Sequence, residues 1–154
     1  MDEKDRDILN LLLEDSRMTL TEISEKIKMS IDTVKNRINR LEDKGIIEGY
    51  TSVISYKKLG YSLKASILIG LHNITQKRYR EFIQALKSDR QVIVLNSIAG
   101  NFDIEAIVIA EGSEDLEKFS KNVRTNFTEI IDSWQTNIIT KTHQIEKFEY
   151  NLTS

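Results

Sequence analysis

Apolar residues in the first third of the chain recur at helical spacing in three separate runs. The i, i+3 and i+4 pattern predicts a first helix that runs to about Glu14, a second that begins after Thr19 and a third that begins after Ser30. Thr19 and Glu22 have the spacing of a capping box, Ser30 is a favourable N-cap residue, and Gly45 is placed to end the third helix. The expected buried positions are Ile8, Leu11 and Leu12 in the first helix, Leu20, Ile23 and Ile27 in the second, and Val34, Ile38 and Leu41 in the third.

The hydrophobic pattern changes after Gly45, and residues 46–55 are rich in β-favouring residues. From residue 63 to residue 71 apolar residues alternate with others, which predicts a strand, and helical spacing returns between Tyr79 and Leu86. We therefore place a domain boundary between the two patterns. The expected parts are a first domain over residues 1–49, a β linker over residues 50–61 and a second domain over residues 62–154.

Two strand-like runs, 92–98 and 102–109, follow in the second domain. They flank Ala99-Gly100-Asn101, where Gly-Asn is a hairpin signal, so the two runs should pair in antiparallel fashion. Ser113 is then expected to cap another helix, and residues 134–142 indicate a last strand. The order β-α-β-β-α-β predicts the ferredoxin-like split unit, and the fold class of the whole chain is α+β.

The tail from Gln144 to Ser154 contains apolar residues among charged ones, namely Ile145, Phe148 and Tyr150. Two interpretations of this tail stay open, a further edge strand and a dimer contact. The aromatic residues Phe82, Phe119 and Trp134 are expected in the core.

Composition and charge narrow the classes of function. The chain has no Cys and two His among 154 residues, which excludes zinc ribbons and thiol chemistry, and no cofactor or metal is expected. No apolar run approaches the roughly 18–20 residues of a membrane span, and the acidic N-terminus is unlike a signal peptide, so we expect a cytoplasmic protein without membrane contact. The net charge of −2 means that nucleic-acid binding would need locally concentrated positive charge. Residues 17–44 contain seven basic and five acidic residues, whereas residues 1–16 contain two basic and six acidic ones.

The second and third predicted helices have the lengths and the short intervening turn of a helix-turn-helix, whose second helix enters the DNA major groove. With its apolar stripe facing inward, the third helix presents Asp32, Asn36 and Asn39 outward. Arginine pairs well with guanine, and asparagine pairs well with adenine. Lysine is better suited to phosphate, and Lys44 is a candidate for such a contact. The candidate DNA contacts are Thr19, Thr21, Ser30, Asp32, Thr33, Lys35, Asn36, Arg37, Asn39 and Arg40. The alternative is that this face is simply the solvated side of an amphipathic helix.

Short motifs in both domains match a known family. They are Asp5 to Leu9 with Leu12, Thr21 to Ser24, Ser30 with Val34 to Ile38 and Leu41, Lys44 to Ile47 with Gly49-Tyr50, and Gly100 to Asp103. In these motifs the chain resembles the Lrp/AsnC (feast/famine) transcription regulators from end to end. One departure is Lys28, which stands where the family's turn usually has Gly, and a left-handed Lys there costs roughly 1 kcal/mol.

The resemblance implies a winged helix-turn-helix head that binds double-stranded DNA, and a transcription regulator rather than an enzyme. It also implies a homodimer formed through the sheets of the second domain, the RAM domain, and further assembly of dimers into a tetramer or an octameric ring. An amino-acid-like effector would lie near the hairpin between subunits. Asp103 could accept its ammonium group, and the backbone N–H groups of Ala99, Gly100 and Asn101 its carboxylate. Alternatively, Asp103 caps the hairpin or forms a salt bridge between subunits.

Two other functions stay open. The sirohaem decarboxylases, enzymes of the same architecture that bind a tetrapyrrole, would need His and Arg side chains that converge on one pocket. The sequence indicates no such cluster, because His72 and His143 are expected as solvated or interface residues, and the arginines of the second domain are dispersed. The other alternative is a RAM domain that serves only for assembly, without an effector.

Overall fold

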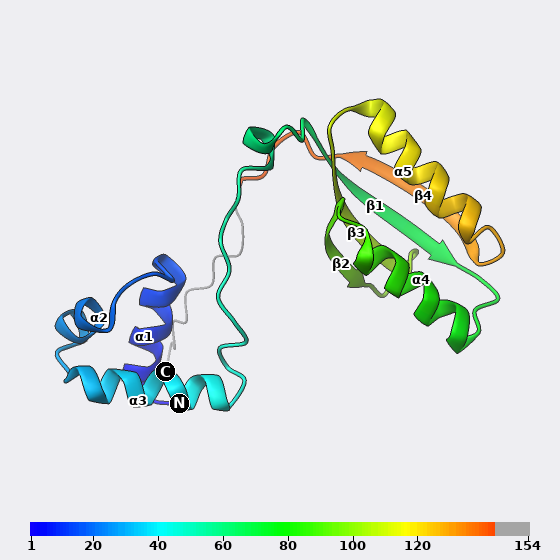
Figure 1. Cartoon of the computed structure of the whole chain (residues 1–154). Helices are drawn as coiled ribbons and strands as arrows, with labels where there is room; N and C mark the ends of the chain where they lie inside the picture. The colour runs from blue at the N-terminus through cyan, green and yellow to red at the C-terminus, as the bar shows by residue number, and fades with distance from the viewer. Residues whose placement is uncertain (144–154) are drawn as a thin grey trace. The chain divides into compact units, whose positions relative to one another are not determined.

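A computed structural model describes residues 1–143 of the chain, which form two compact units (Figure 1). The first unit comprises residues 1–53 and the second residues 54–142. The predicted α+β class is confirmed, since the first unit is helical and the second combines helices with a sheet. Within residues 1–143 every helix is too short or too polar to span a bilayer.

The first unit is a bundle of three helices, α1 (Glu3–Glu14), α2 (Leu20–Ile27) and α3 (Ile31–Asp43). Thr19 and Glu22 form the predicted capping box at α2, and the hydroxyl of Ser30 caps α3 by accepting a hydrogen bond from the backbone N–H of Thr33. The core confirms the predicted helical spacing, with Leu11, Leu12 and Leu20 half-buried around it. Its fully buried members are Ile8, Ile23, Ile27, Val34, Ile38 and Leu41.

Two left-handed residues end the second and third helices. Lys28 adopts φ 55° and ψ 53°, which confirms the conformation expected for the turn between α2 and α3. Gly45 has φ +64°, a conformation that costs glycine little. The N–H of Gly45 donates to the carbonyl of Glu42 at 2.8 Å, and the N–H of Ile46 to that of Leu41 at 2.9 Å. This pattern is a Schellman motif, so the predicted end of the third helix is confirmed.

The predicted β linker over residues 50–61 is wrong. The structure has no strand there, and its regular element is a single 3₁₀ turn, η1 (Tyr56–Leu59). β-favouring side chains alone do not make a strand, because the backbone also needs a neighbouring strand to satisfy its N–H and C=O groups. Within residues 1–143 no strand pairs with this segment.

The second unit is a four-stranded antiparallel sheet with two helices. Its strand order β2-β3-β1-β4 is that of the predicted ferredoxin-like unit. The elements are β1 (Leu63–Leu71), α4 (Gln76–Ser88), β2 (Val92–Ser97), β3 (Ile104–Ala110), α5 (Ser113–Asn126) and β4 (Ile131–Ile138). In the register of the two central strands Ile69 lies opposite Ile104, and the predicted hairpin between β2 and β3 is confirmed.

Both helices cover the same face of the sheet (Figure 1). The odd-numbered residues of β1 and the even-numbered residues of β3 point into the resulting core, as alternation in a strand requires. Phe82 of α4 is fully buried and meets Phe127 edge to face at 5.1 Å. Phe119 is also buried, whereas Trp134 packs half-buried against the core. The opposite face of the sheet has no helix over it from the described part of the chain.

Two details differ from the sequence predictions. Ser113 is the first helical residue of α5 and not its cap, which is Gly112, while the carboxylate of Asp115 accepts the backbone N–H of Glu111 at 3.0 Å. The last strand begins three residues before Trp134 and ends at Ile138, because pairing with β1 outweighs the weak strand preference of the polar residues at its start. The proposed roles of the tail from Gln144 to Ser154 lie outside the described residues.

Candidate nucleic-acid interface

The outer face of α3 is a continuous row of polar side chains. Val34, Ile38 and Leu41 are buried on the inner face, so α2, the turn and α3 have the predicted helix-turn-helix arrangement. Thr33 and Arg37 are half-buried at the margins of the row. Its exposed members are Asp32, Lys35, Asn36, Asn39 and Arg40.

The hydroxyl groups near the two helix starts are already used within the first unit. The Oγ1 of Thr19 donates to the carboxylate of Glu22 at 2.7 Å and accepts the backbone N–H of Glu22 at 3.2 Å. The Oγ of Ser30 and the Oγ1 of Thr33 lie 2.7 Å apart. The hydrogen bond from Thr19 lowers the pKa of Glu22, which keeps a negative charge at the start of α2. This charge opposes a phosphate at that helix start and leaves the exposed Thr21 as the freer hydroxyl.

Two arginines of α3 are bound to the start of α1. The Nη1 of Arg37 donates to Asp2 at 2.7 Å and to Asp5 at 2.7 Å. The Nη2 of Arg40 donates to the two carboxylate oxygens of Asp5 at 2.8 and 2.9 Å. The side chain of Asp5 is 2% exposed, against 20% for Arg37 and 49% for Arg40. Arg37 is therefore engaged mainly inside the unit, whereas Arg40 still presents half of its side chain to solvent.

These contacts fix the charge states of the cluster. Burial by itself would raise the pKa of Asp5, but hydrogen bonds from Arg37 and from the backbone of Asp2 outweigh it and lower that pKa. Hydrogen bonds from Arg37 and from the backbone N–H of Asp5 likewise lower the pKa of Asp2. The hydrogen bonds to both carboxylates raise the pKa of Arg37. Asp2, Asp5 and Arg37 are thus all ionised at neutral pH.

The sequence did not predict this cluster, although it contained a signal. Asp2, the N-cap of α1, lies three residues before Asp5, and Arg37 and Arg40 are three residues apart on α3. Residues at this spacing lie on one face of a helix. The two acids therefore form a negative face and the two bases a positive face, and the two faces have opposite charge. An acidic first turn also favours a helix start, so these acids do not by themselves indicate a partner on another helix.

Three lysines complete the positive charge around the exposed row. Lys28, in the turn, Lys35, on α3, and Lys44, at the end of α3, are all exposed. No ion pair to a partner within residues 1–143 engages any of the three. These ammonium groups are available to phosphate, while the pairing of Arg37 and Arg40 reduces the positive charge that the sequence indicated.

The hairpin between β2 and β3 is the second candidate site. The carboxylate of Asp103 accepts the backbone N–H of Leu71 at 2.7 Å, and the backbone N–H of Asp103 donates to the carbonyl of Ile69 at 3.0 Å. Asp103 thus ties the hairpin to the end of β1, which is the capping role that the sequence left open. Its side chain is exposed, and one carboxylate oxygen has no hydrogen bond from the described residues.

The hairpin loop itself presents free donors. Ala99, Gly100 and Asn101 are exposed, and their backbone N–H groups donate to no acceptor among residues 1–143. Glu105, two residues after Asp103, accepts hydrogen bonds from Ser66 at 2.8 Å and from Asn96 at 3.2 Å on the uncovered face of the sheet. The loop donors and Asp103 together offer partners for both ends of an amino acid, as the sequence predicts.

Histidine and arginine side chains of the second unit do not converge. The Nδ1 of His72 lies 3.9 Å from the carboxylate of Asp132, whereas Arg78 pairs with Glu81 and Glu129. Arg124 stacks over the ring of Trp134 at 5.9 Å. Residues 1–143 also contain no group of three or more potential metal-binding side chains. The described residues therefore offer no cluster suited to a tetrapyrrole or a metal.

Comparison with known proteins identifies the family. Residues 1–48 match the model of winged helix-turn-helix DNA-binding domains. The regulator LrpA of Pyrococcus horikoshii is 39% identical over 122 residues, which cover 79% of this chain and 84% of LrpA. The chain belongs to the Lrp/AsnC family of transcriptional regulators.

Solved structures of Lrp/AsnC regulators agree along nearly the whole chain. Escherichia coli AsnC has a TM-score of 0.81 and 26% identity, and the match covers 97% of this chain and 98% of AsnC. A transcriptional regulator of Neisseria meningitidis in complex with L-Met has a TM-score of 0.87 and 20% identity, over 99% of this chain and 97% of that one. The relatives named here are regulators, which fits the expectation of a non-enzyme.

Proposed function

We propose that this Lrp/AsnC-type regulator recognises double-stranded DNA by sequence, with α3 in the major groove. The exposed polar row of α3 is the observation on which the proposal rests. Asn36 lies beside Lys35, which forms no ion pair within residues 1–143, and base edges and phosphates need these two kinds of group.

The structure supports different roles for the side chains of the row. Asn36 is exposed at its centre and suits a bidentate pair with adenine. Lys35 suits phosphate, since it is exposed and unpaired within the described chain. Arg40 is half-exposed and can reach DNA with the nitrogens that Asp5 does not use, while Arg37 positions α3. Asp32 and Asn39 stay candidates within the row, and Thr19, Thr21, Ser30 and Thr33 stay candidates beside it.

The uncovered face of the sheet in the second unit supports a homodimer. It combines half-buried Leu68 and Ile107 with polar side chains such as Glu105. Such mixed faces suit association of two copies, which would bring two heads to one operator. The operator should then be a pseudo-palindrome with half-sites near multiples of one helical turn. Assembly into tetramers or octameric rings stays a prediction from the family resemblance.

An amino acid is the effector that the hairpin fits best. Its ammonium group would pair with the free oxygen of Asp103 and its carboxylate with the N–H groups of Ala99 to Asn101. The L-Met complex of the Neisseria regulator supports the idea that this fold can hold an amino acid. A ligand there alters regulation only if it binds one assembly more tightly than another.

Selection of genomic fragments with the full chain, followed by two substitutions, tests the DNA-binding proposal. Asn36→Ala should cost about 1–3 kcal/mol and relax preference at particular base pairs. Lys35→Ala should weaken all sequences alike and lower the slope of log K against log salt by about one. Lys118→Ala, at an exposed position of α5, removes the same charge outside the helix-turn-helix and serves as the control. An unchanged ranking of operator variants in Asn36→Ala would refute the proposed orientation of α3.

A calorimetric screen of amino acids against the full chain tests the effector. Binding of one amino acid, with a change in DNA affinity or in oligomeric state, is the expected result. Binding of none would leave the second unit as an assembly module only.

A further inference from the structure

A groove of about 790 Å³ runs along the first unit between α1 and the segment that follows α3. Leu9, Leu12 and Leu13 of α1 form one wall, and Ile47 and Val53 belong to the other. Leu13 is 54% exposed and Val53 78%, so the groove presents apolar surface to solvent. The volume lies within the range of roughly 300–1,000 Å³ in which sites accept a small molecule or a few side chains.

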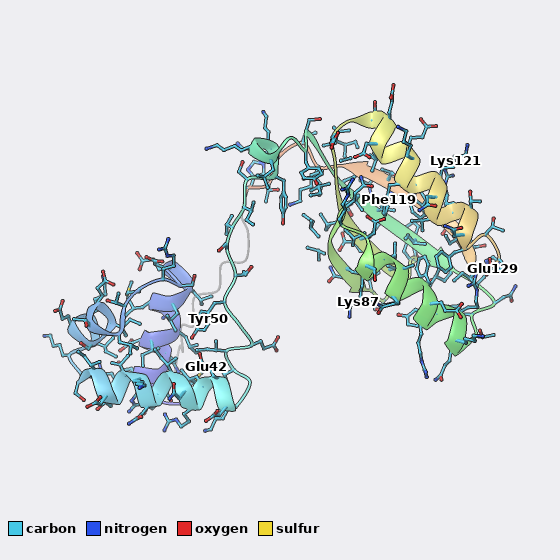
Figure 2. The ribbon with its side chains drawn as sticks, viewed as in Figure 1. Glu42, Tyr50, Lys87, Phe119, Lys121 and Glu129 are labelled. Carbon is cyan, nitrogen blue, oxygen red and sulfur yellow. The ribbon has the colours of Figure 1, made fainter. Side chains whose placement is uncertain are left out.

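A polar contact holds the second wall in place. The hydroxyl of Tyr50 donates to a carboxylate oxygen of Glu42 at 2.9 Å, and the two side chains point toward each other in Figure 2. Burial and the neighbouring carboxylate raise the pKa of Tyr50 to about 12, so the phenol stays protonated and remains a donor. The groove is therefore bounded on this side by a segment fixed to α3, and not by a loose connection.

We propose that the end of this chain, residues 144–154, occupies the groove. In this segment Phe148, Tyr150 and Leu152 alternate with Lys147, Glu149 and Asn151. An extended segment with this alternation presents three large apolar side chains on one side and polar ones on the other. The apolar side of such a segment would face the groove, and its polar side would face the solvent.

The covalent structure allows the tail to reach the groove. The backbone N–H of Ile139 donates to the carbonyl of Lys64 at 2.8 Å, so the chain leaves β4 beside the start of β1. Val53, in the groove, is ten residues before Leu63, a path of at most about 36 Å. Phe148 is nine residues after Ile139, a path of up to about 32 Å. The 3₁₀ turn η1 lies in the connecting segment and rises only about 2 Å per residue, which shortens that path to about 30 Å. The tail is thus long enough to return to the wall that contains Val53.

A tethered segment is favoured over a second copy as the occupant. A short flexible tether holds its end at an effective concentration of the order of mM. A surface of another molecule would compete from free solution at a much lower concentration. Docking of the tail would cover the apolar surface of Leu13 and Val53.

Cysteine labelling of the full chain tests the proposal, because the sequence has no Cys of its own. Leu13→Cys places a thiol in the groove, and its reaction with a maleimide is followed in the full chain and in a chain that stops at His143. We expect the thiol to react at least about tenfold faster without residues 144–154, since protection reports how often the site opens. Equal rates in the two chains would overturn the proposal.

The matched control is Ile31→Cys, which places a thiol at a 45% exposed apolar position of α3 outside the groove and should react equally fast in both chains. If the shortened chain folds poorly, Phe148→Asp in the full-length chain should expose Leu13→Cys in the same way. Protection that persists in the shortened chain would show another copy in the groove and overturn the proposal.

Oxidation of a chain with both Leu13→Cys and Phe148→Cys locates the tail directly. A disulfide within one chain is the expected product on a non-reducing gel. A disulfide between two chains would show that the tail docks on a neighbouring molecule. The absence of any disulfide would show that the tail does not dock near Leu13. Either result would contradict the proposal.

Discussion

The carboxylate of Asp5, on α1, lies 2.8 Å from the guanidinium of Arg40, on α3, although 35 positions separate the two residues. Asp5 is almost completely buried and also accepts a hydrogen bond from Arg37. The first turn of α1 thereby determines where α3 lies, and with it the polar row that faces outward. This buried carboxylate, which lies on another helix than the proposed DNA contacts, is thus a positioning residue for them.

Asp5→Asn should lower the free energy of unfolding of the first unit by about 1.5–3 kcal/mol, the usual value of hydrogen bonds to a charged group. The substitution keeps the size of the side chain and removes the charge opposite Arg37 and Arg40. Urea unfolding of the full chain, followed by circular dichroism, measures the loss. Asp7→Asn is the control, since Asp7 forms an exposed pair with Lys4 and should change stability by less than about 0.5 kcal/mol.

Acid should weaken the same contact. The pKa of Asp5 in the folded chain is lowered from 3.8, so its ion pairs add stability that is fully present above that value and is lost as pH falls through the lower, folded pKa. The stability difference between the natural chain and Asp5→Asn should therefore be constant near neutral pH and shrink below about pH 4. Unfolding curves at several pH values would contradict this if the difference stayed constant in acid.

Lys28→Gly should stabilise the first unit by about 0.5–1 kcal/mol, because the left-handed conformation at Lys28 is strained for any residue with a Cβ. Glycine removes the strain, which raises stability. It also raises the conformational entropy of the unfolded chain, and this effect offsets only part of the gain in stability. Lys26→Gly is the matched control, and within α2 it should cost about 0.5–1 kcal/mol. Thermal unfolding of the two variants should therefore shift in opposite directions.

Asp103→Ala should reduce stability of the second unit by about 0.5–1.5 kcal/mol, since the N–H of Leu71, at the end of the central strand β1, loses its acceptor. It should also abolish the calorimetric response to the amino acid that the screen identifies. Asp132→Ala, at another exposed acid of the sheet, should leave that response intact. An unchanged affinity for the amino acid in Asp103→Ala would mean that the carboxylate serves only as a cap.

Patterns that depend on local geometry could be predicted from the sequence. The exposed row of α3 follows from a rotation of 100° per residue once Val34, Ile38 and Leu41 are inside. The left-handed turn followed from the place of Lys28 between two capped helices. Strand order followed from the alternation of helices and strands, because few topologies accommodate β-α-β-β-α-β.

Features that depend on distant partners could not be predicted in the same way. The β preference of residues 50–61 gave no strand, since a strand forms only beside another strand. The roles of Arg37 and Arg40 depended on Asp2 and Asp5, more than 30 residues earlier, and helical periodicity gives a face but not its partner. The hydrogen bond from Leu71 to the carboxylate of Asp103 could not be predicted for the same reason, because Leu71 belongs to a different strand and lies 32 positions earlier.

The hydrogen bond between Ile139 and Lys64 places the entry and exit of the sheet side by side. A unit whose two ends meet at one point can be joined to other chains through short connections, without threading a segment across its own fold. Insertion into a host protein, or replacement of the helical head by another binding module, would therefore leave the sheet and its two helices undisturbed. Because its two ends lie side by side, the second unit could be transferred between proteins as one module.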